Sequence, residues 1–89
     1  MQQALIKITG IVQGVCYRAN AQKAARSLNL TGYAKNMPDG SVQALVQGEK
    51  QDILKFIEWC NKGSESAEVK TIETNWQEAT KKLSEFKIY

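Results

Sequence analysis

The chain has no histidine, and its 89 residues include only two cysteines and one proline. The absence of histidine excludes zinc-finger ligand spacings and any acid–base scheme built on an imidazole. The two cysteines, Cys16 and Cys60, are too few for a disulfide scaffold. No apolar stretch approaches the roughly 20 residues that a membrane-spanning helix needs, and residues 1–7 lack the basic segment and apolar run of a signal peptide. We therefore expect neither export nor membrane insertion.

What the composition does contain is typical of a small globular protein. Apolar residues make up 43% of the chain and charged residues 24%, which is near the average for folded domains. A chain of 89 residues has room for one small domain, so we expect a single domain over residues 1–89. The net charge is +3, but basic and acidic residues are interleaved, as in residues 49–62. Interleaved charge is typical of a solvated surface rather than of a nucleic-acid-binding patch.

The segment from Gly10 to Arg18, GIVQGVCYR, carries the clearest chemical signal. It places a two-glycine loop between an apolar strand-like run and an alanine-rich helical run, and it ends on an arginine. Glycine lets the backbone approach a ligand closely, and the start of a helix presents unpaired N–H groups. An arginine fork matches two phosphate oxygens. The segment therefore predicts a phosphate-binding loop.

The first half of the chain predicts a strand, a helix and a hairpin. Residues 4–9 alternate in the period of a strand with a buried face. Apolar residues recur at helical spacing from Tyr17 to Leu28, and Gly32 is the expected stop of this helix. Residues 33–36 predict a short strand, Pro38-Asp39-Gly40 a turn, and residues 42–47 the partner strand.

The second half predicts another helix and two further strands. Ile53, Phe56, Ile57 and Cys60 share one face of a helix expected to end near Gly63. Residues 69–76 are rich in β-branched side chains and predict a strand; residues 77–84 favour no element, and residues 86–89 predict a short terminal strand. The order β-α-β-β-α-β plus a short extra C-terminal strand predicts an α+β, ferredoxin-like split βαβ sandwich. In this fold two helices cover one face of an antiparallel sheet.

This topology brings two distant segments together. The strands at 4–9 and 33–36 run in the same direction with the strand at 42–47 between them, so the glycine loop and Asn36 are expected at the same edge of the sheet. Two inter-strand spacings, roughly 10 Å, separate the two strands. An arginine side chain, a phosphate group and one water fit such a gap.

The chain resembles the acylphosphatase family through two motifs. Residues 10–18 match the family pattern G-x-V-Q-G-V-x-[FY]-R, and residues 86–88 are similar to its closing F-x-I strand. The second motif is carried by Gly32-Tyr33-Ala34-Lys35-Asn36, Gly40, Val42 and Gly48. The resemblance covers essentially the whole chain. The chain departs from the family in residues 63–67, GSESA, where the family often has a Gly-Pro segment.

The resemblance implies an enzyme that hydrolyses the carboxyl–phosphate anhydride of small acyl phosphates to a carboxylate and inorganic phosphate. It implies no metal, no cofactor and no covalent intermediate. Arg18 matches the family's phosphate-binding arginine and Asn36 its water-orienting asparagine. The substrate-binding loop that follows from the match comprises Gly14, Val15, Cys16, Tyr17 and Arg18. We expect a cytoplasmic monomer whose partner is a small acyl phosphate, without nucleic-acid or membrane partners.

The residues alone leave two other functions to be considered. A covalent cysteine phosphatase needs a cysteine, five residues and then an arginine; after Cys16 that place is taken by Gln22, which argues against this class. A non-catalytic ferredoxin-like module that binds an anion or RNA needs paired aromatic side chains on the central strands. Those strands carry Lys7, Thr9, Gln43 and Gln47 instead. A Cys16–Cys60 disulfide is a further alternative, although two free thiols are expected in the cytoplasm.

Overall fold

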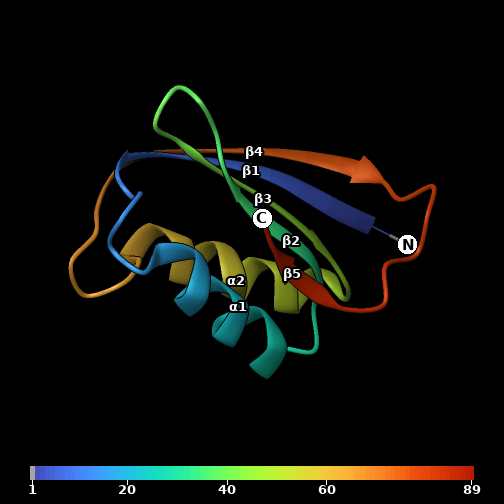
Figure 1. Cartoon of the computed structure of the whole chain (residues 1–89). Helices are drawn as coiled ribbons and strands as arrows, with labels where there is room; N and C mark the ends of the chain where they lie inside the picture. The colour runs from blue at the N-terminus through green and yellow to red at the C-terminus, as the bar shows by residue number, and fades with distance from the viewer. Residues whose placement is uncertain (1) are drawn as a thin grey trace.

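The computed structural model describes residues 2–89, which form a five-stranded sheet with two helices on one face (Figure 1). The predicted domain begins at residue 1, which lies outside the described residues. The elements in chain order are β1 (Gln2–Ile11), α1 (Tyr17–Ser27), β2 (Thr31–Asn36), β3 (Val42–Gln47), α2 (Lys50–Lys62), β4 (Glu68–Glu78) and β5 (Phe86–Ile88). The strand order β4-β1-β3-β2-β5 confirms the predicted ferredoxin-like topology with its short extra strand.

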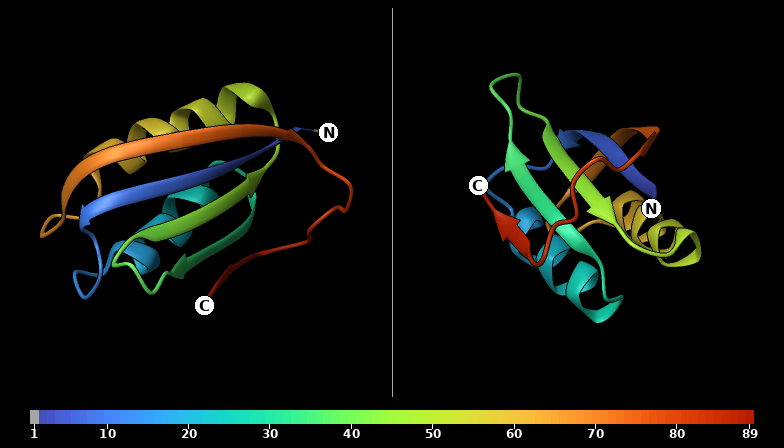
Figure 2. Two further views of the ribbon diagram at one scale, coloured as in Figure 1. Left: turned by 90° about the horizontal axis from the view of Figure 1, so that it is seen from above. Right: turned by 90° about the vertical axis from the view of Figure 1, so that its right-hand side faces the viewer.

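The pairing of the strands decides where the site lies. Strand β3 is antiparallel to both β1 and β2, while β4 extends the sheet beyond β1 and β5 pairs parallel to β2. Because β1 and β2 flank β3, they run in the same direction and end at the same edge, as the two views of Figure 2 show. The loop after β1 and Asn36 at the end of β2 therefore lie at one end of the sheet, as predicted.

The core lies between the sheet and the helices. The inward side chains of the three central strands are Ala4, Ile6, Ile8, Ala34, Val42, Ala44 and Val46, and all are buried. Ala21 and Ala25 of α1 and Ile53, Phe56 and Cys60 of α2 cover them. The small alanine face lets α1 pack closely on the sheet, which fixes the start of this helix relative to the strand ends.

The predicted end of the first helix is wrong. Helix α1 ends at Ser27, and the chain turns at Asn29, whose φ is 58°. Leu30 N–H donates to the Ala25 carbonyl at 2.9 Å and Asn29 N–H to the Arg26 carbonyl at 3.1 Å, the bonds of a Schellman motif. Gly32 lies instead within β2, with φ 143°, where a Cβ atom would come within 1.7 Å of the Leu45 carbonyl oxygen. Glycine is needed there for the close approach of two strands.

Several elements are longer in the structure than predicted. The structure also gives the path of residues 79–85, which lie in the part of the sequence that favours no element. Strands β1 and β4 are longer at both ends than predicted, and α2 begins at Lys50 and ends before Gly63. Residues 79–85 run between β4 and β5, which are the two edge strands, and so pass the end of the sheet (Figure 1). Neither helix in the described part of the chain is long and apolar enough to cross a membrane.

Candidate active site

The loop between β1 and α1 forms the floor of the candidate site. Gly14 has φ 75° and Cys16, the N-cap residue of α1, has φ 61°, so both are left-handed. A Cβ atom on Gly14 would meet nothing within 4 Å, so the backbone angle is what requires glycine there. Among the described residues, no protein acceptor pairs with the backbone N–H groups of Val15, Cys16, Tyr17 or Arg18. Unpaired N–H groups at a helix start form a binding place for an anion.

The loop is held in place by side chains from other elements. Gln13 Nε2 donates to the carbonyl oxygens of both Met37 and Ser41 at 2.9 Å, which ties the loop to the β2–β3 hairpin. Ser64 Oγ, in the segment that departs from the family pattern, donates to the Val15 carbonyl at 2.7 Å. The loop is therefore fixed on two sides, and Gln13 brings it next to the residue that follows Asn36.

The side chain of Tyr17 lies in the core rather than in the candidate site. Its ring is 1% exposed, and its hydroxyl donates to the Cys60 carbonyl of α2 at 2.8 Å. Desolvation, together with the neighbouring Cys60, raises the pKa of the Tyr17 hydroxyl well above its ordinary value. The side chain thus anchors α1 to α2, because a neutral, buried hydroxyl in this place serves as a structural donor.

Arg18 lies in the first turn of α1, next to the loop. Its Nη1 atom donates to the backbone oxygen of Tyr89, the residue that follows β5. A guanidinium group carries five N–H donors in a fixed plane, so a single contact with Tyr89 orients the group and leaves further donors for a phosphate. The start of α1 and the end of β5 together determine where this cation points.

Asn36, the last residue of β2, carries a polar atom without a partner. Its Oδ1 atom is buried and accepts no hydrogen bond from the described residues. Such an atom costs about 1–3 kcal/mol relative to a satisfied one, so it marks a place for a donor from water or a ligand.

The turn after Asn36 is held by several hydrogen bonds and one ion pair. Asp39 Oδ1 accepts hydrogen bonds from the Ser41 hydroxyl at 2.5 Å and from the Ser41 backbone N–H at 2.9 Å, and Lys7 Nζ lies 3.2 Å from Asp39 Oδ2. The Ser41 bonds, with a smaller contribution from Lys7, lower the pKa of Asp39 to about 2. The Met37 N–H donates to the Ser41 carbonyl at 2.8 Å and closes the hairpin. The predicted turn is confirmed, and it holds the backbone beside Asn36.

The two cysteines are not joined. Cys16 is exposed and Cys60 is buried in the core, and both are free thiols. Gln22, which stands where a cysteine phosphatase would have its arginine, donates from Nε2 to the Phe86 carbonyl at 2.8 Å. That side chain is engaged with β5, so the covalent alternative gains nothing from the geometry.

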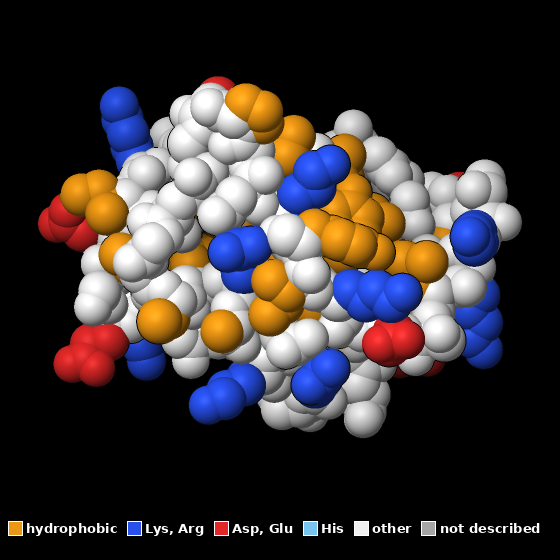
Figure 3. Space-filling view, in the orientation of Figure 1, with side chains coloured by type: hydrophobic (Ala, Val, Ile, Leu, Met, Phe, Trp, Pro, Cys, Tyr) orange, Lys and Arg blue, Asp and Glu red, His pale blue; other side chains and the backbone are white. Residues whose placement is uncertain are grey.

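On the face of the molecule seen in Figure 1, the basic side chains do not gather in a single cluster. Figure 3 shows Lys and Arg side chains scattered around a hydrophobic patch on the face seen in Figure 1. Tyr33 and Tyr89, with ring centroids 5.8 Å apart, lie on β2 and just after β5, whereas paired aromatic side chains were looked for on β1 and β3. The described residues hold no group of three or more His, Cys, Asp or Glu side chains that could bind a metal ion.

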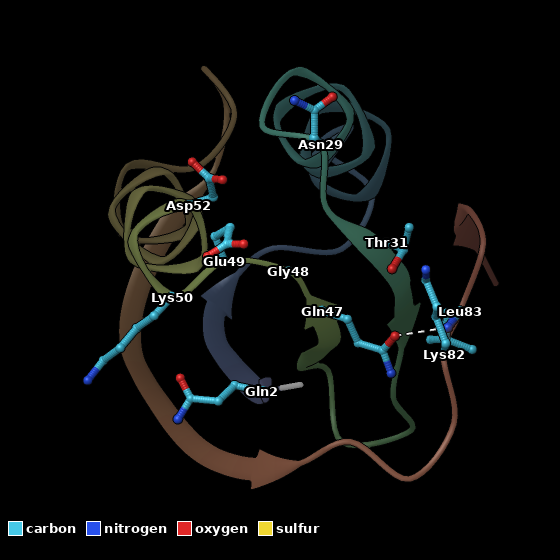
Figure 4. A pocket seen from close by; sticks show the side chains of 10 residues that line it. All are labelled: Gln2, Asn29, Thr31, Gln47, Gly48, Glu49, Lys50, Asp52, Lys82 and Leu83. Atoms are coloured by element: carbon cyan, nitrogen blue, oxygen red, sulfur yellow. Dashed lines mark hydrogen bonds between the residues drawn. The ribbon is translucent and has the colours of Figure 1, made fainter.

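A cavity of about 700 Å³ lies at the opposite end of the sheet (Figure 4). Its lining includes Gln2 and Thr31, which begin β1 and β2, and Gln47, which ends β3. The site loop and Asn36 lie where β1 and β2 end, so the cavity is separate from the candidate site. Gln47 is only 3% exposed, which corrects its placement among the open side chains of the sheet surface.

Comparisons with known proteins identify the family of the chain. The family model described as Acylphosphatase matches residues 4–88. An acylphosphatase from Shewanella amazonensis is 47% identical over 88 residues, covering 99% of this chain and 97% of the relative, and one from Aliivibrio fischeri is 44% identical over 88 residues, covering 96% and 93%. The crystal structure of acylphosphatase from Bacillus subtilis superposes with a TM-score of 0.97 at 31% identity, covering 100% of this chain and 99% of that one. The chain therefore belongs to the acylphosphatase family and is an acid-anhydride hydrolase that acts on acyl phosphates.

Proposed function

We propose that Arg18 and the backbone N–H groups of residues 15–18 bind the phosphoryl group of an acyl phosphate, while Asn36 orients the attacking water. The observation that carries this proposal is the buried, unpartnered Oδ1 atom of Asn36 at the sheet edge where the unpaired helix start also lies. An amide oxygen accepts a hydrogen bond from water, and the N–H groups and guanidinium donate to an anion. The two halves of the site therefore match the two reactants.

The chemistry needs little beyond this arrangement. An acyl phosphate is a mixed anhydride with a good carboxylate leaving group, so the enzyme has to position water and stabilise charge on the phosphoryl oxygens. Water attacks phosphorus, the bond from phosphorus to the carboxylate oxygen breaks, and a phosphoryl oxygen of the substrate accepts the water proton. No imidazole is required, in keeping with a chain that contains no histidine.

We also propose that this hydrolysis proceeds without a metal ion, in a cytoplasmic monomer that acts as one domain over residues 1–89 and has no nucleic-acid or membrane partner. Hydrolysis without a metal ion is supported by the hydrogen-bond donors of the loop. The loop offers N–H groups and a guanidinium, which suit an anion, whereas hard cations take oxygen ligands. Hydrolysis should be unchanged after incubation with a strong chelator, and a loss that added Mg²⁺ reverses would contradict the proposal.

The roles of the two side chains are tested by comparing Arg18→Ala and Asn36→Ala. Arg18→Ala should raise KM and sharply lower kcat, because it removes the cation that faces the phosphoryl group in both the bound substrate and the transition state. Asn36→Ala should lower kcat about 10²- to 10³-fold, the usual effect of removing one group that acts on the reacting centre, while the Ki of inorganic phosphate stays unchanged. The assay is hydrolysis of benzoyl phosphate, with a phosphate monoester as the control substrate. Near-normal hydrolysis by either variant would remove that residue from its role.

A further inference from the structure

Residues 79–85, here called the strap, are fastened to the sheet by the buried side chain of Gln47. Gln47 Nε2 donates to the Lys81 carbonyl at 2.7 Å. Its Oε1 accepts from the Leu83 N–H at 2.9 Å, the bond drawn as a dashed line in Figure 4. The amide thus pairs with the strap as a neighbouring strand would, through one donor and one acceptor. A side chain that is 3% exposed and bonded in both directions fixes the backbone it holds.

The amide of Gln47 is itself held by two further glutamines. Gln47 Nε2 also donates to Gln3 Oε1 at 2.9 Å, and Gln3 Nε2 donates to Gln77 Oε1 at 2.7 Å. Gln3 is paired in register with Gln47 on one side and with Gln77 on the other, so the three side chains cross β3, β1 and β4 in a row. The row fixes the orientation of the Gln47 amide, which forms the hydrogen bonds to the strap.

The strap continues directly into β5 and from there to the candidate site. The Gly32 N–H donates to the Glu85 carbonyl at 2.9 Å, and Phe86 is buried with its ring 6.0 Å from that of Phe56. At the other end of β5, the Tyr89 N–H donates to the Ala34 carbonyl at 2.9 Å, and the Tyr89 oxygen accepts from Arg18. One continuous segment therefore links the Gln47 amide to the Arg18 guanidinium.

Strand β5 is short, and apart from its pairing with β2 it is held by the buried ring of Phe86 and by Gln22, which donates to the Phe86 carbonyl. It has three residues and is paired on one side only, parallel to β2. Parallel pairing is slightly weaker per residue than antiparallel pairing, and short edge elements open locally at little cost. The Tyr89 oxygen lies one residue beyond this strand, so its position depends on the strap before β5 as well as on the bond from the Tyr89 N–H to the Ala34 carbonyl.

We propose that Gln47 is a positioning residue for the reaction, which fixes the strap and β5 so that the Tyr89 oxygen holds the Arg18 guanidinium in its phosphate-binding orientation. This inference rests on the role proposed above for Arg18. It gives the row of Gln47, Gln3 and Gln77 a function in the site, although the row lies at the opposite end of the sheet.

The test compares Gln47→Met with Gln43→Met. Methionine has a similar length but cannot pair with the strap. Gln43 lies on the same strand, and its amide accepts from the Tyr33 hydroxyl on the open face of the sheet rather than from the strap. Gln47→Met should raise both the KM for benzoyl phosphate and the Ki of inorganic phosphate about three- to tenfold, while Gln43→Met leaves both near the wild-type values.

A second variant and a second background keep the test decisive. Leu83→Pro removes the backbone N–H that donates a hydrogen bond to Gln47 Oε1, and Leu83 is not a residue of the buried core. This variant tests the proposal if Gln47→Met does not fold. In an Arg18→Lys background, Gln47→Met should have little further effect on the Ki of phosphate, because its partner in the coupling is already gone. Unchanged KM and Ki in the folded variants, or an equal effect in the Arg18→Lys background, would overturn the inference. If Arg18→Ala itself binds phosphate normally, the proposed function fails instead.

Discussion

At the scale of single residues, a substitution at Cys16 distinguishes a non-covalent reaction from a covalent one. Its backbone occupies the N-cap position of α1 with φ 61°, while its side chain is exposed and makes no capping bond. If only the backbone N–H serves the reaction, Cys16→Ser should change kcat/KM for benzoyl phosphate by no more than about twofold, as for other exposed replacements. Complete loss of hydrolysis in a folded Cys16→Ser protein would instead indicate a thiolate nucleophile.

The site residues that the sequence predicts are those whose residue type and motif indicate a chemical role. Arg18 and Asn36 lie in recognisable motifs, and the structure places them on the two elements that were expected to meet. Gln13 belongs to the first motif, but its role and that of Gln47 could not be predicted, because a glutamine that bonds to distant backbone groups looks the same in the sequence as a solvated one. Their backbone partners are 24 to 36 positions away, and only the folded chain brings them near.

At the scale of elements, the site depends on the loop before α1 staying docked on the β2–β3 hairpin. Gln13→Leu removes both hydrogen bonds to the hairpin and should lower kcat/KM about tenfold, because a small displacement of positioned groups slows the reaction strongly. The same change should lower the free energy of unfolding by about 1 kcal/mol. Urea unfolding and benzoyl phosphate hydrolysis measure the two effects.

Gln51→Leu, on the exposed surface of α2, is the matched control and should alter neither quantity. A Gln13→Leu enzyme that loses stability but keeps its full kcat/KM would mean that the bonds to Met37 and Ser41 support the fold without positioning the loop.

Element order was predictable, whereas several element ends were not. Periodicity finds a helix or a strand because burial repeats along it, which is why the sequence predicts the core faces of α1 and β3. Gly32 suits a helix stop equally well in sequence, and only the 1.7 Å approach of a built Cβ atom to the Leu45 carbonyl reveals its actual role. Asn29, the true left-handed residue after α1, carries no signal stronger than that of the nearby glycine.

At the scale of the whole molecule, the strap is the part of the fold that local sequence could not predict. Residues 79–85 have neither helical nor strand periodicity, and their path is decided by where β5 pairs. That pairing joins the last residues of the chain to β2 at the edge opposite β4, so it depends on long-range contacts alone. The same contacts connect both ends of the sheet, which is why a change at Gln47 is expected to reach Arg18.

Alkaline pH tests the packing of α1 against α2. Burial raises the pKa of the Cys60 thiol to about 12, and desolvation also raises the pKa of Tyr17. In the unfolded chain these groups titrate near about 8.5 and 10. Below pH 8 both states keep both protons, so stability does not depend on these groups. Above these values only the unfolded chain loses the protons, so the free energy of unfolding should fall by up to about 1.4 kcal/mol per pH unit for each group.

Urea unfolding between pH 7 and 11 measures this loss, and two variants assign it. Cys60→Ala should remove the part of the decline that begins near pH 8.5, and Tyr17→Phe the part that begins near pH 10, at the ordinary thiol and phenol values. Because Cys60→Ala leaves a cavity and Tyr17→Phe loses the bond to the Cys60 carbonyl, each variant is less stable at pH 7, and the comparison is made on slopes rather than absolute values. A decline with the same slope in both variants as in the wild type would mean that these buried groups ionise while the protein remains folded, and that the contact between α1 and α2 is open to solvent.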